Sequence, residues 1–197
     1  ELYAENSSYG KDRPIFTTLG YPSSVEEGWI TSSEEKQAKM LARILLTDQF
    51  SGVNVTFWYN HQDDIYAMAT WGFYGLYKSQ DEGSKILEPK PAYVAAKAFS
   101  SLLQGFHFLS RLNAGGSEEY VLEFADANAA ESRYAAWTRS GTPVTITAPL
   151  KKGSYQIFSH LGDKLSELRV EQGTASLKVS DAPVYLIPMN SQVNAAE

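Results

Sequence analysis

Two pairs of adjacent acidic residues, Glu26-Glu27 and Asp63-Asp64, each follow a short apolar run in the N-terminal half of the chain. Carboxyl groups held close together can act as nucleophile and general acid/base in hydrolysis, or they can bind a cation. Acidic pairs in polar loops are more often solvated charges. The sequence therefore favours solvated carboxylates. A relocated nucleophile or a cation site is the alternative, with Glu26 and Glu27 as catalytic candidates.

Aromatic residues gather around the same loops. Trp58 and Tyr59 end the second apolar run, and Trp29 and Trp71 lie in neighbouring loops. Flat rings stack on the apolar faces of sugars, but aromatic side chains are also good strand and core residues. We expect part of this group to contact a ligand and the rest to pack.

The three histidines lie on separate predicted elements, with no spacing typical of a metal site or a catalytic triad. His61 follows the second apolar run, where a lone loop histidine is more often solvated than functional. Gly115-Gly116 indicates a turn, because neither a Lys-Ser/Thr pair nor a helix follows it. The sequence predicts no metal and no cofactor.

Two strands and a helix must position these residues. The apolar runs Arg13–Leu19 and Val53–Tyr59 predict buried strands, and an amphipathic helix is expected from about Ser33 to Phe50. Ser32 and Glu35 have the spacing of a capping box. The apolar face of this helix is expected to carry Met40, Leu41, Ile44, Leu45 and Thr47. Strand, helix, strand implies parallel pairing of the two strands.

A second helix is predicted with Pro91 as its first residue, continuing over Tyr93–Leu103 and ending at Gly105. From Phe106 onward helical periodicity is replaced by alternating runs separated by turn residues, which is typical of a small antiparallel β-sandwich. The expected strands are Phe106–Leu112, Tyr120–Ala125, Arg133–Arg139, Val144–Ala148, Ser154–Ser159, Leu165–Val170, Ala175–Val179 and Val184–Ile187. Within them, the aromatics Tyr134, Trp137, Tyr155 and Tyr185 are expected to be packing residues.

The order of these segments resembles the last quarter of the barrel in retaining glycoside hydrolases of clan A, particularly families such as 39 and 5. The segments are Phe16–Pro22, a helix rich in Leu and Gln-Ala, Phe57-Trp58-Tyr59, Gly75-Leu76-Tyr77 and Pro89–Tyr93. The resemblance implies a partial (β/α) TIM barrel followed by a β-sandwich, an α/β plus all-β fold. It also implies that Trp58 is the aromatic on which a sugar ring stacks, so Trp58 is the strongest candidate ligand contact. The further candidates for substrate binding are Tyr59, His61, Trp29 and Trp71.

Thr18 departs from the family pattern, because it stands where these families carry their nucleophilic glutamate. Retaining hydrolysis needs two carboxyl groups about 5–5.5 Å apart. A threonine hydroxyl is not ionised near neutral pH without an adjacent base, and its ether with a sugar would not turn over as a glycosyl ester does. The strand that supplies the acid/base residue in this clan has no counterpart in the chain. We therefore expect this chain by itself to lack catalytic competence.

Composition excludes several classes of protein. The net charge of −6 offers no basic surface for nucleic acid, and the absence of cysteine removes disulfides and thiolate chemistry. There is no apolar stretch of the ~18 residues that a membrane span needs, so a soluble chain is expected. Localisation stays open, with secretion or the periplasm as alternatives.

Three regions are predicted: residues 1–105 as the C-terminal portion of a glycosidase-like barrel, 106–190 as the sandwich, and 191–197 as a tail. Two strands cannot close a barrel and would leave parallel edges unpaired. The expected partners are an oligosaccharide or polysaccharide, together with a missing barrel segment, a partner chain or self-association at those edges. The functional hypotheses are a part of a glycoside-hydrolase-like protein, a non-catalytic glycan-binding or scaffold protein, and a structural module unrelated to sugars.

Overall fold

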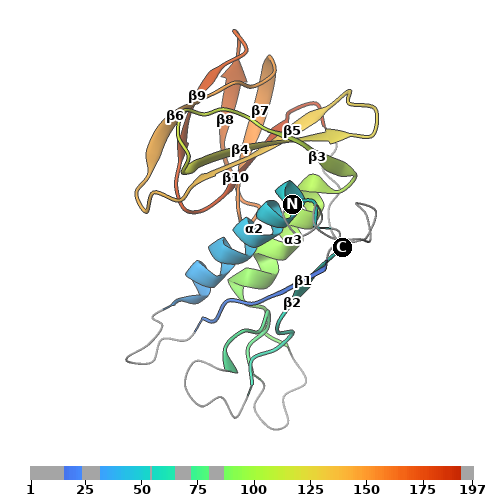
Figure 1. The fold of residues 1–197 in the computed structure, drawn as a ribbon, viewed down its shortest axis with the longest axis vertical. Helices are drawn as coiled ribbons and strands as arrows, with labels where there is room; N and C mark the ends of the chain where they lie inside the picture. Colours follow the sequence, from blue (N-terminus) through green and yellow to red (C-terminus); the bar gives the residue numbers. More distant parts are fainter. Residues whose placement is uncertain (1–15, 24–31, 54, 65–71, 80–86, 192–197) are drawn as a thin grey trace, which may run out of the picture.

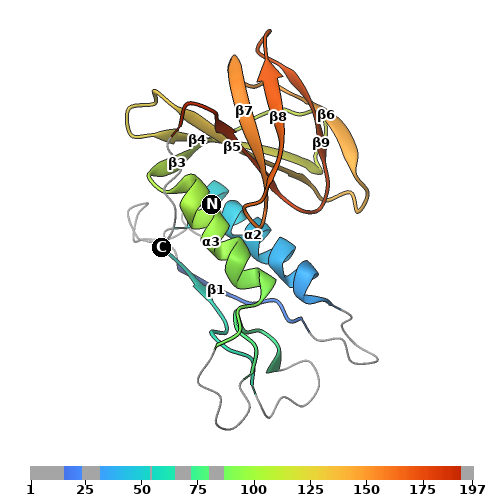
Figure 2. The same ribbon diagram turned by 180° about the vertical axis from the view of Figure 1, so that it is seen from behind.

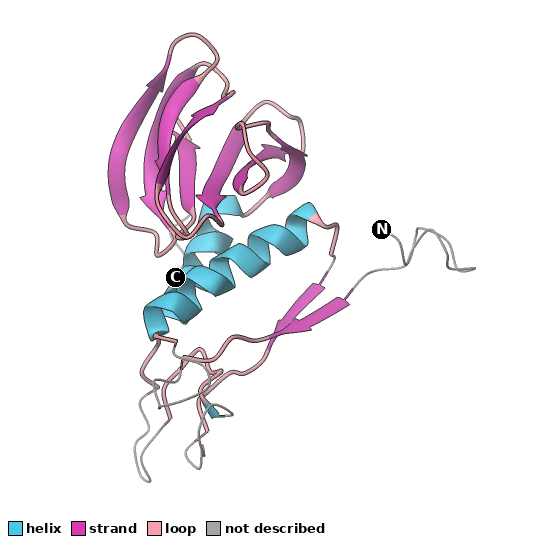
Figure 3. Ribbon diagram, turned by 60° about the vertical axis from the view of Figure 1, so that its left-hand side comes forward, coloured by secondary structure: helices cyan, strands magenta, loops and turns pink. Residues whose placement is uncertain are grey.

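The computed structural model describes residues 16–23, 32–53, 55–64, 72–79 and 87–191. The described elements form two consecutive groups (Figure 1). The first is β1 (Phe16–Leu19), α2 (Glu34–Phe50), β2 (Val55–Trp58) and α3 (Pro91–Leu103). β1 and β2 pair in parallel, because the helix between them returns the chain to the same end of the sheet. Both helices lie across one face of this pair (Figure 3).

The second group is antiparallel and follows α3 directly. Its strands are β3 (Phe106–Arg111), β4 (Glu119–Asp126), β5 (Ser132–Thr138), β6 (Val144–Ala148), β7 (Gly153–Ser159), β8 (Lys164–Val170), β9 (Ala175–Val179) and β10 (Val184–Pro188). Six of them form one sheet in the order β3-β4-β5-β10-β7-β8, and β6 pairs with β9. All eight strands predicted from the alternating runs are present, with ends that differ by at most one residue.

The six-stranded sheet is covered on both faces. Tyr134 and Ala136 of β5 pack in a cluster shared with β6 and β9, whereas Ala135 and Trp137 pack against α2 and α3. Every residue of β5 is therefore buried. The helices form the layer between this sheet and the β1–β2 pair (Figures 1 and 2). The prediction that Tyr134, Trp137, Tyr155 and Tyr185 are packing residues is confirmed, since each is at most 3% exposed.

Two details of α2 differ from the sequence prediction. The N-cap is Ser33, whose Oγ accepts a hydrogen bond from the Lys36 amide at 3.1 Å, so the predicted cap at Ser32 was one residue early. Of the predicted apolar face, Thr47 is exposed and Met40 is half-buried. The helix contacts layers on two sides, and its buried apolar residues are Ala38, Leu41, Ala42 and Leu46.

The turn between β7 and β8 connects the sheet to the helices. Leu161 packs against the apolar cluster of α2 and α3, and the neighbouring His160 is buried with no hydrogen-bond partner for Nε2 among the described residues. Burial lowers the pKa of His160, and the charge of Lys39 lowers it further, while Glu35, Asp181 and Asp163 act in the opposite direction. The neutral imidazole is thus the form that fits this junction.

We expect the free energy of unfolding to fall as the pH drops below about 6.5, the ordinary pKa of histidine. The unfolded chain takes up the His160 proton first, so the stability that neutral His160 contributes is complete above that pH and is lost as the pH falls through the lower folded-state pKa. Urea unfolding between pH 7.5 and 5 tests this expectation. The His160→Gln variant should show a shallower pH dependence, and equal slopes for the two proteins would contradict it.

Candidate functional site

The candidate site lies where β1 and β2 end, next to the first turns of α2 and α3, at the lower end of the molecule in Figure 1. Residues 72–77 join the two strand ends. The Ser23 amide donates to Phe73 O at 2.9 Å, the Asn60 amide donates to Tyr74 O at 3.1 Å, and the Leu76 amide donates back to Asn60 O at 3.1 Å. The peptide bond between Tyr59 and Asn60 is cis. Main-chain hydrogen bonds thus fix the loops of the site relative to each other.

A fully buried lysine lies beneath these loops. Lys90, the N-cap of α3, is 0% exposed, and its Nζ lies 2.9 and 3.0 Å from the two carboxylate oxygens of Asp63. It also donates to Ser23 Oγ at 2.7 Å. A buried ammonium group is tolerated only with such partners. Lys90 therefore ties together the loop after β1, the loop after β2 and the start of α3.

Asp63 and Gln37 complete this buried cluster. Asp63 Oδ1 accepts the Gly75 amide at 2.7 Å, and Gln37, from the first turns of α2, donates to Tyr21 O at 2.8 Å. The interpretation of Asp63 as a solvated carboxylate was wrong, because its residue is 8% exposed and its charge is paired with Lys90. Asp64 is exposed, as expected.

Sequence reasoning missed this cluster, although one signal was present. The N-cap of α3 is a lysine, where Ser, Thr, Asp and Asn are preferred and where the helix dipole disfavours a cation. A lysine at that position, preceded and followed by prolines, indicates that its ammonium group pairs with an acidic side chain elsewhere in the chain. The sequence does not reveal that the partner is Asp63, 27 residues away.

Trp58 and Tyr59 lie on opposite faces of the strand end. Trp58 packs against the cluster of Leu41, Ala42 and other α2 and α3 residues, and its indole N–H donates to Tyr74 O at 3.0 Å. Tyr59 is 56% exposed, with its ring 5.8 Å from that of Tyr74. The helix packing accounts for the position of Trp58, while Tyr59 presents an open ring.

His61 is exposed beside a row of aromatic rings. Its ring lies 5.1 Å from that of Tyr77, which in turn lies 4.9 Å from that of Tyr93. The hydrogen bond between the two tyrosines raises the pKa of Tyr77. The Tyr77 phenol therefore stays protonated at neutral pH, and it shares a hydrogen bond with Tyr93.

The remaining predicted site residues are described only in part. Thr18 pairs with Phe57 in the β1–β2 register, so its backbone lies one residue before the end of β1. Glu26, Glu27, Trp29 and Trp71 lie outside the described residues. The Asp63 carboxylate forms an ion pair with Lys90. It could act as a nucleophile only if that ion pair were broken.

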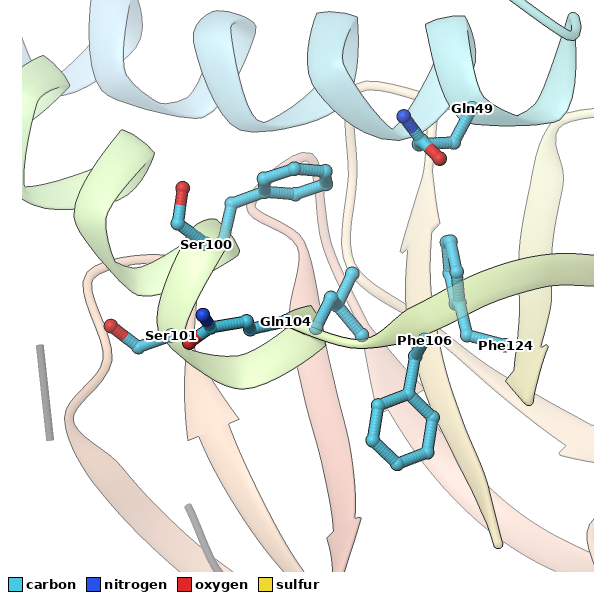
Figure 4. A pocket seen from close by; sticks show the side chains of 8 residues that line it. Gln49, Ser100, Ser101, Gln104, Phe106 and Phe124 are labelled. Atoms are coloured by element: carbon cyan, nitrogen blue, oxygen red, sulfur yellow. The ribbon is translucent and has the colours of Figure 1, made fainter. Parts of the chain in front are cut away.

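A cavity of about 380 Å³ lies at the other ends of α2 and α3. Figure 4 shows Gln49 reaching toward it from α2, Ser100 and Ser101 on α3, and Phe106 and Phe124 on the strands below. No charged side chain lines it in the described part of the chain. The 13 residues of α3 separate it from the strand ends by roughly 20 Å, so it is not part of the candidate site.

Comparison with solved structures shows which proteins have a similar fold. No family model matches the sequence, and no curated protein matches it. The fold matches that of a GH30 endoxylanase from Clostridium papyrosolvens C71, with a TM-score of 0.59 at 11% identity over 89% of this chain and 42% of that one. At this identity the match shows a shared fold and nothing more.

A stronger likeness is to a family 39 glycoside hydrolase from the gut symbiont Bacteroides cellulosilyticus WH2. That match has a TM-score of 0.73 at 26% identity and covers 95% of this chain, which confirms the resemblance to glycoside hydrolases of clan A seen in the sequence. It covers 36% of the family 39 chain, so the present chain spans about a third of that protein's length.

Among the described residues, no helix is long and apolar enough to cross a membrane.

Proposed function

We propose that this chain is part of a glycoside-hydrolase-like protein that binds an oligosaccharide or polysaccharide. In this proposal, residues 1–105 are the last part of a (β/α)8 barrel, residues 106–190 are an appended β-sandwich and residues 191–197 are a tail. The observation that carries it is the parallel β1–β2 pair with the exposed ring of Tyr59 at its carboxyl end. Ligand-binding residues of barrel enzymes lie at this end of the strands.

Further strands beside β1 and β2 belong to the proposal. Val55 is 39% exposed and Phe57 is 54% exposed on the face of β2 away from the helices. Parallel sheets occur almost only with both faces covered. A missing barrel segment, a partner chain or a second copy would bury this face and pair the strand edges.

A non-catalytic role is the second candidate, and Thr18 is the residue that favours it. With threonine at the nucleophile position, the chain would bind a glycan without forming a glycosyl ester. We propose that the chain by itself does not hydrolyse glycosides. A glycan-binding or scaffold protein derived from a glycosidase is the alternative to a part of an active enzyme.

We expect the Tyr59→Ala variant to bind neutral oligosaccharides about five-fold more weakly, because stacking on an aromatic ring contributes on the order of 1 kcal/mol. Binding is measured by NMR titration with xylo- and gluco-oligosaccharides. The control is Phe50→Ala, which removes a 37% exposed ring at the far end of α2. Equal affinities of the two variants would contradict the site. Reducing ends released in the same samples would contradict the non-catalytic proposal.

A further inference from the structure

The turn between β7 and β8, residues 160–163, extends beyond the six-stranded sheet and lies against the two helices (Figure 2). Its Leu161 side chain packs against the apolar cluster that contains Leu41 of α2 and Ala95 of α3. The turn also lies close to the α3 backbone, because a Cβ on Gly162 would be 3.3 Å from the Cβ of Ala98. The turn therefore makes a contact of its own between the sheet and the helices.

Hydrogen bonds hold this turn together internally. The Ser159 amide donates to Asp163 O at 2.8 Å, and Ser159 Oγ accepts the amides of Leu161 and Asp163, each at 3.1 Å. Among the described residues, no main-chain hydrogen bond joins the turn to α2 or α3. β8 is also an edge strand of the sheet. The turn can therefore leave the helices as a unit, and local openings of this kind cost less free energy than global unfolding.

His160 is the titratable side chain that the contact buries. The residue is 8% exposed, and its Nε2 has no hydrogen-bond partner among the described residues. A neutral imidazole tolerates this burial better than an imidazolium, whose two N–H groups both need acceptors. Protonation of His160 therefore favours the conformation in which the turn is solvated.

Charged groups of α2, of the turn and of the β9–β10 connection act on His160. Burial lowers its pKa and Lys39 of α2 lowers it further, whereas Glu35 of α2, Asp181 of the β9–β10 connection and Asp163 of the turn raise it. The three carboxylates have partners of their own. Glu35 and Asp181 lie 3.0 and 3.4 Å from Lys39 Nζ, and Asp163 accepts a hydrogen bond within the turn at 3.1 Å. Burial and the Lys39 charge therefore outweigh them.

The main contact between the six-stranded sheet and the helices is apolar. Leu46 of α2 and Leu102 of α3 pack in one cluster with Trp137 and Tyr185 of the sheet. A proton on His160 adds no charge to this cluster, so the packing of the sheet on the helices persists when the turn leaves. A release of the turn at acid pH is therefore local.

We propose that the β7–β8 turn forms an acid-sensitive contact: protonation of His160 releases the turn from α2 and α3 while the sheets and the helices stay folded. A buried histidine that gains a charge is a common basis of such switches. Release takes Leu161 away from the apolar cluster that Trp58 also contacts. The proposal is independent of glycan binding.

Linkage between proton uptake and release gives the direction of the pH dependence. The solvated histidine of the released turn takes up its proton near pH 6.5, the ordinary value, and the buried histidine takes it up at lower pH. The bound turn is therefore fully favoured above about pH 6.5. Below it, the released population rises by up to about ten-fold per pH unit until the pH reaches the pKa of the buried histidine.

NMR spectra recorded between pH 7.5 and 5 test the proposal. We expect the Leu161 methyl signals to show exchange broadening that increases as His160 becomes protonated, and the cross-peak between Gly162 and Ala98 to weaken over the same range. The methyl signals of Leu186, in the core between the two sheets, should not change.

Two variants assign the transition to the histidine. His160→Gln should remove the pH dependence of the Leu161 signals, and the control His107→Gln, which replaces an exposed histidine of β3, should retain it. Lys39→Met removes the neighbouring positive charge, so it should move the His160 titration to higher pH and lower the released population at pH 5.

Three results would overturn the proposal. Leu161 signals that stay unchanged down to pH 5 would show that the turn does not leave the helices. Simultaneous changes at Leu161 and Leu186 would show global unfolding in place of a local release. The same pH dependence in His160→Gln as in the unmodified protein would assign the transition to another group.

Discussion

Replacing Lys90 by methionine is expected to lower the free energy of unfolding by about 3–5 kcal/mol. Methionine fills a similar volume, so the cost is electrostatic. The Asp63 carboxylate, in a residue 8% exposed, loses its ion pair at 2.9 Å and must be buried unpaired or protonated. The loops after β1 and β2 lose their common contact at the same time. Urea unfolding at pH 7, followed by circular dichroism, measures the change.

Two controls separate the ion pair from the loss of any lysine. Lys97→Met removes an exposed lysine on the same helix and should change stability by less than about 0.5 kcal/mol. The double variant Lys90→Met/Asp63→Asn removes both charges while keeping an acceptor for the Gly75 amide, so it should be more stable than Lys90→Met. A Lys90→Met variant as stable as Lys97→Met would show that the ion pair contributes nothing.

The antiparallel half could be predicted from sequence almost residue by residue. β6 and β9 begin and end where the alternation of Val144–Ala148 and Ala175–Val179 does, because one face of each strand packs on the other sheet and one face is solvated. β5 was expected as one more alternating run, but it does not alternate, because both its faces are buried. A strand can be predicted from its local residue pattern when the contacts that stabilise it recur at regular positions along it.

The candidate site was harder to predict because its contacts join distant segments. Successive side chains of a strand point to opposite faces, so the sequence indicates that Trp58 and Tyr59 face opposite ways. It does not indicate which face the helices cover. The structure places Trp58 under the helices and leaves Tyr59 open. The sequence likewise marks Asp63 and Lys90 as charged, while their pairing depends on how the chain closes over 27 residues. Long-range pairing of this kind has no local signature.

Gly75→Ala is the second variant for which a large effect is expected, a loss of about 3 kcal/mol in the free energy of unfolding. A Cβ on Gly75 would collide with the backbone of Gln62 and Asp63 and would lie 2.7 Å from the carbonyl oxygen of Tyr77. Backbone atoms cannot rotate away as the end of a side chain can. The loop after β2 would have to move, and the hydrogen bond from the Gly75 amide to Asp63 would be lost with it.

Gly116→Ala is the matched control, because its Cβ would meet only the carboxylate end of the flexible Glu119 side chain. We expect a change below about 0.5 kcal/mol there. The two variants also differ in their effect on the site: displacement of Asp63 in Gly75→Ala should weaken oligosaccharide binding together with stability, while Gly116→Ala should leave both unchanged. A Gly75→Ala variant that is destabilised but binds oligosaccharide as tightly as the unmodified protein would contradict this expectation. The buried cluster would then stabilise the fold without positioning the candidate site. The position of Tyr59 would depend instead on the main-chain hydrogen bonds of residues 72–77.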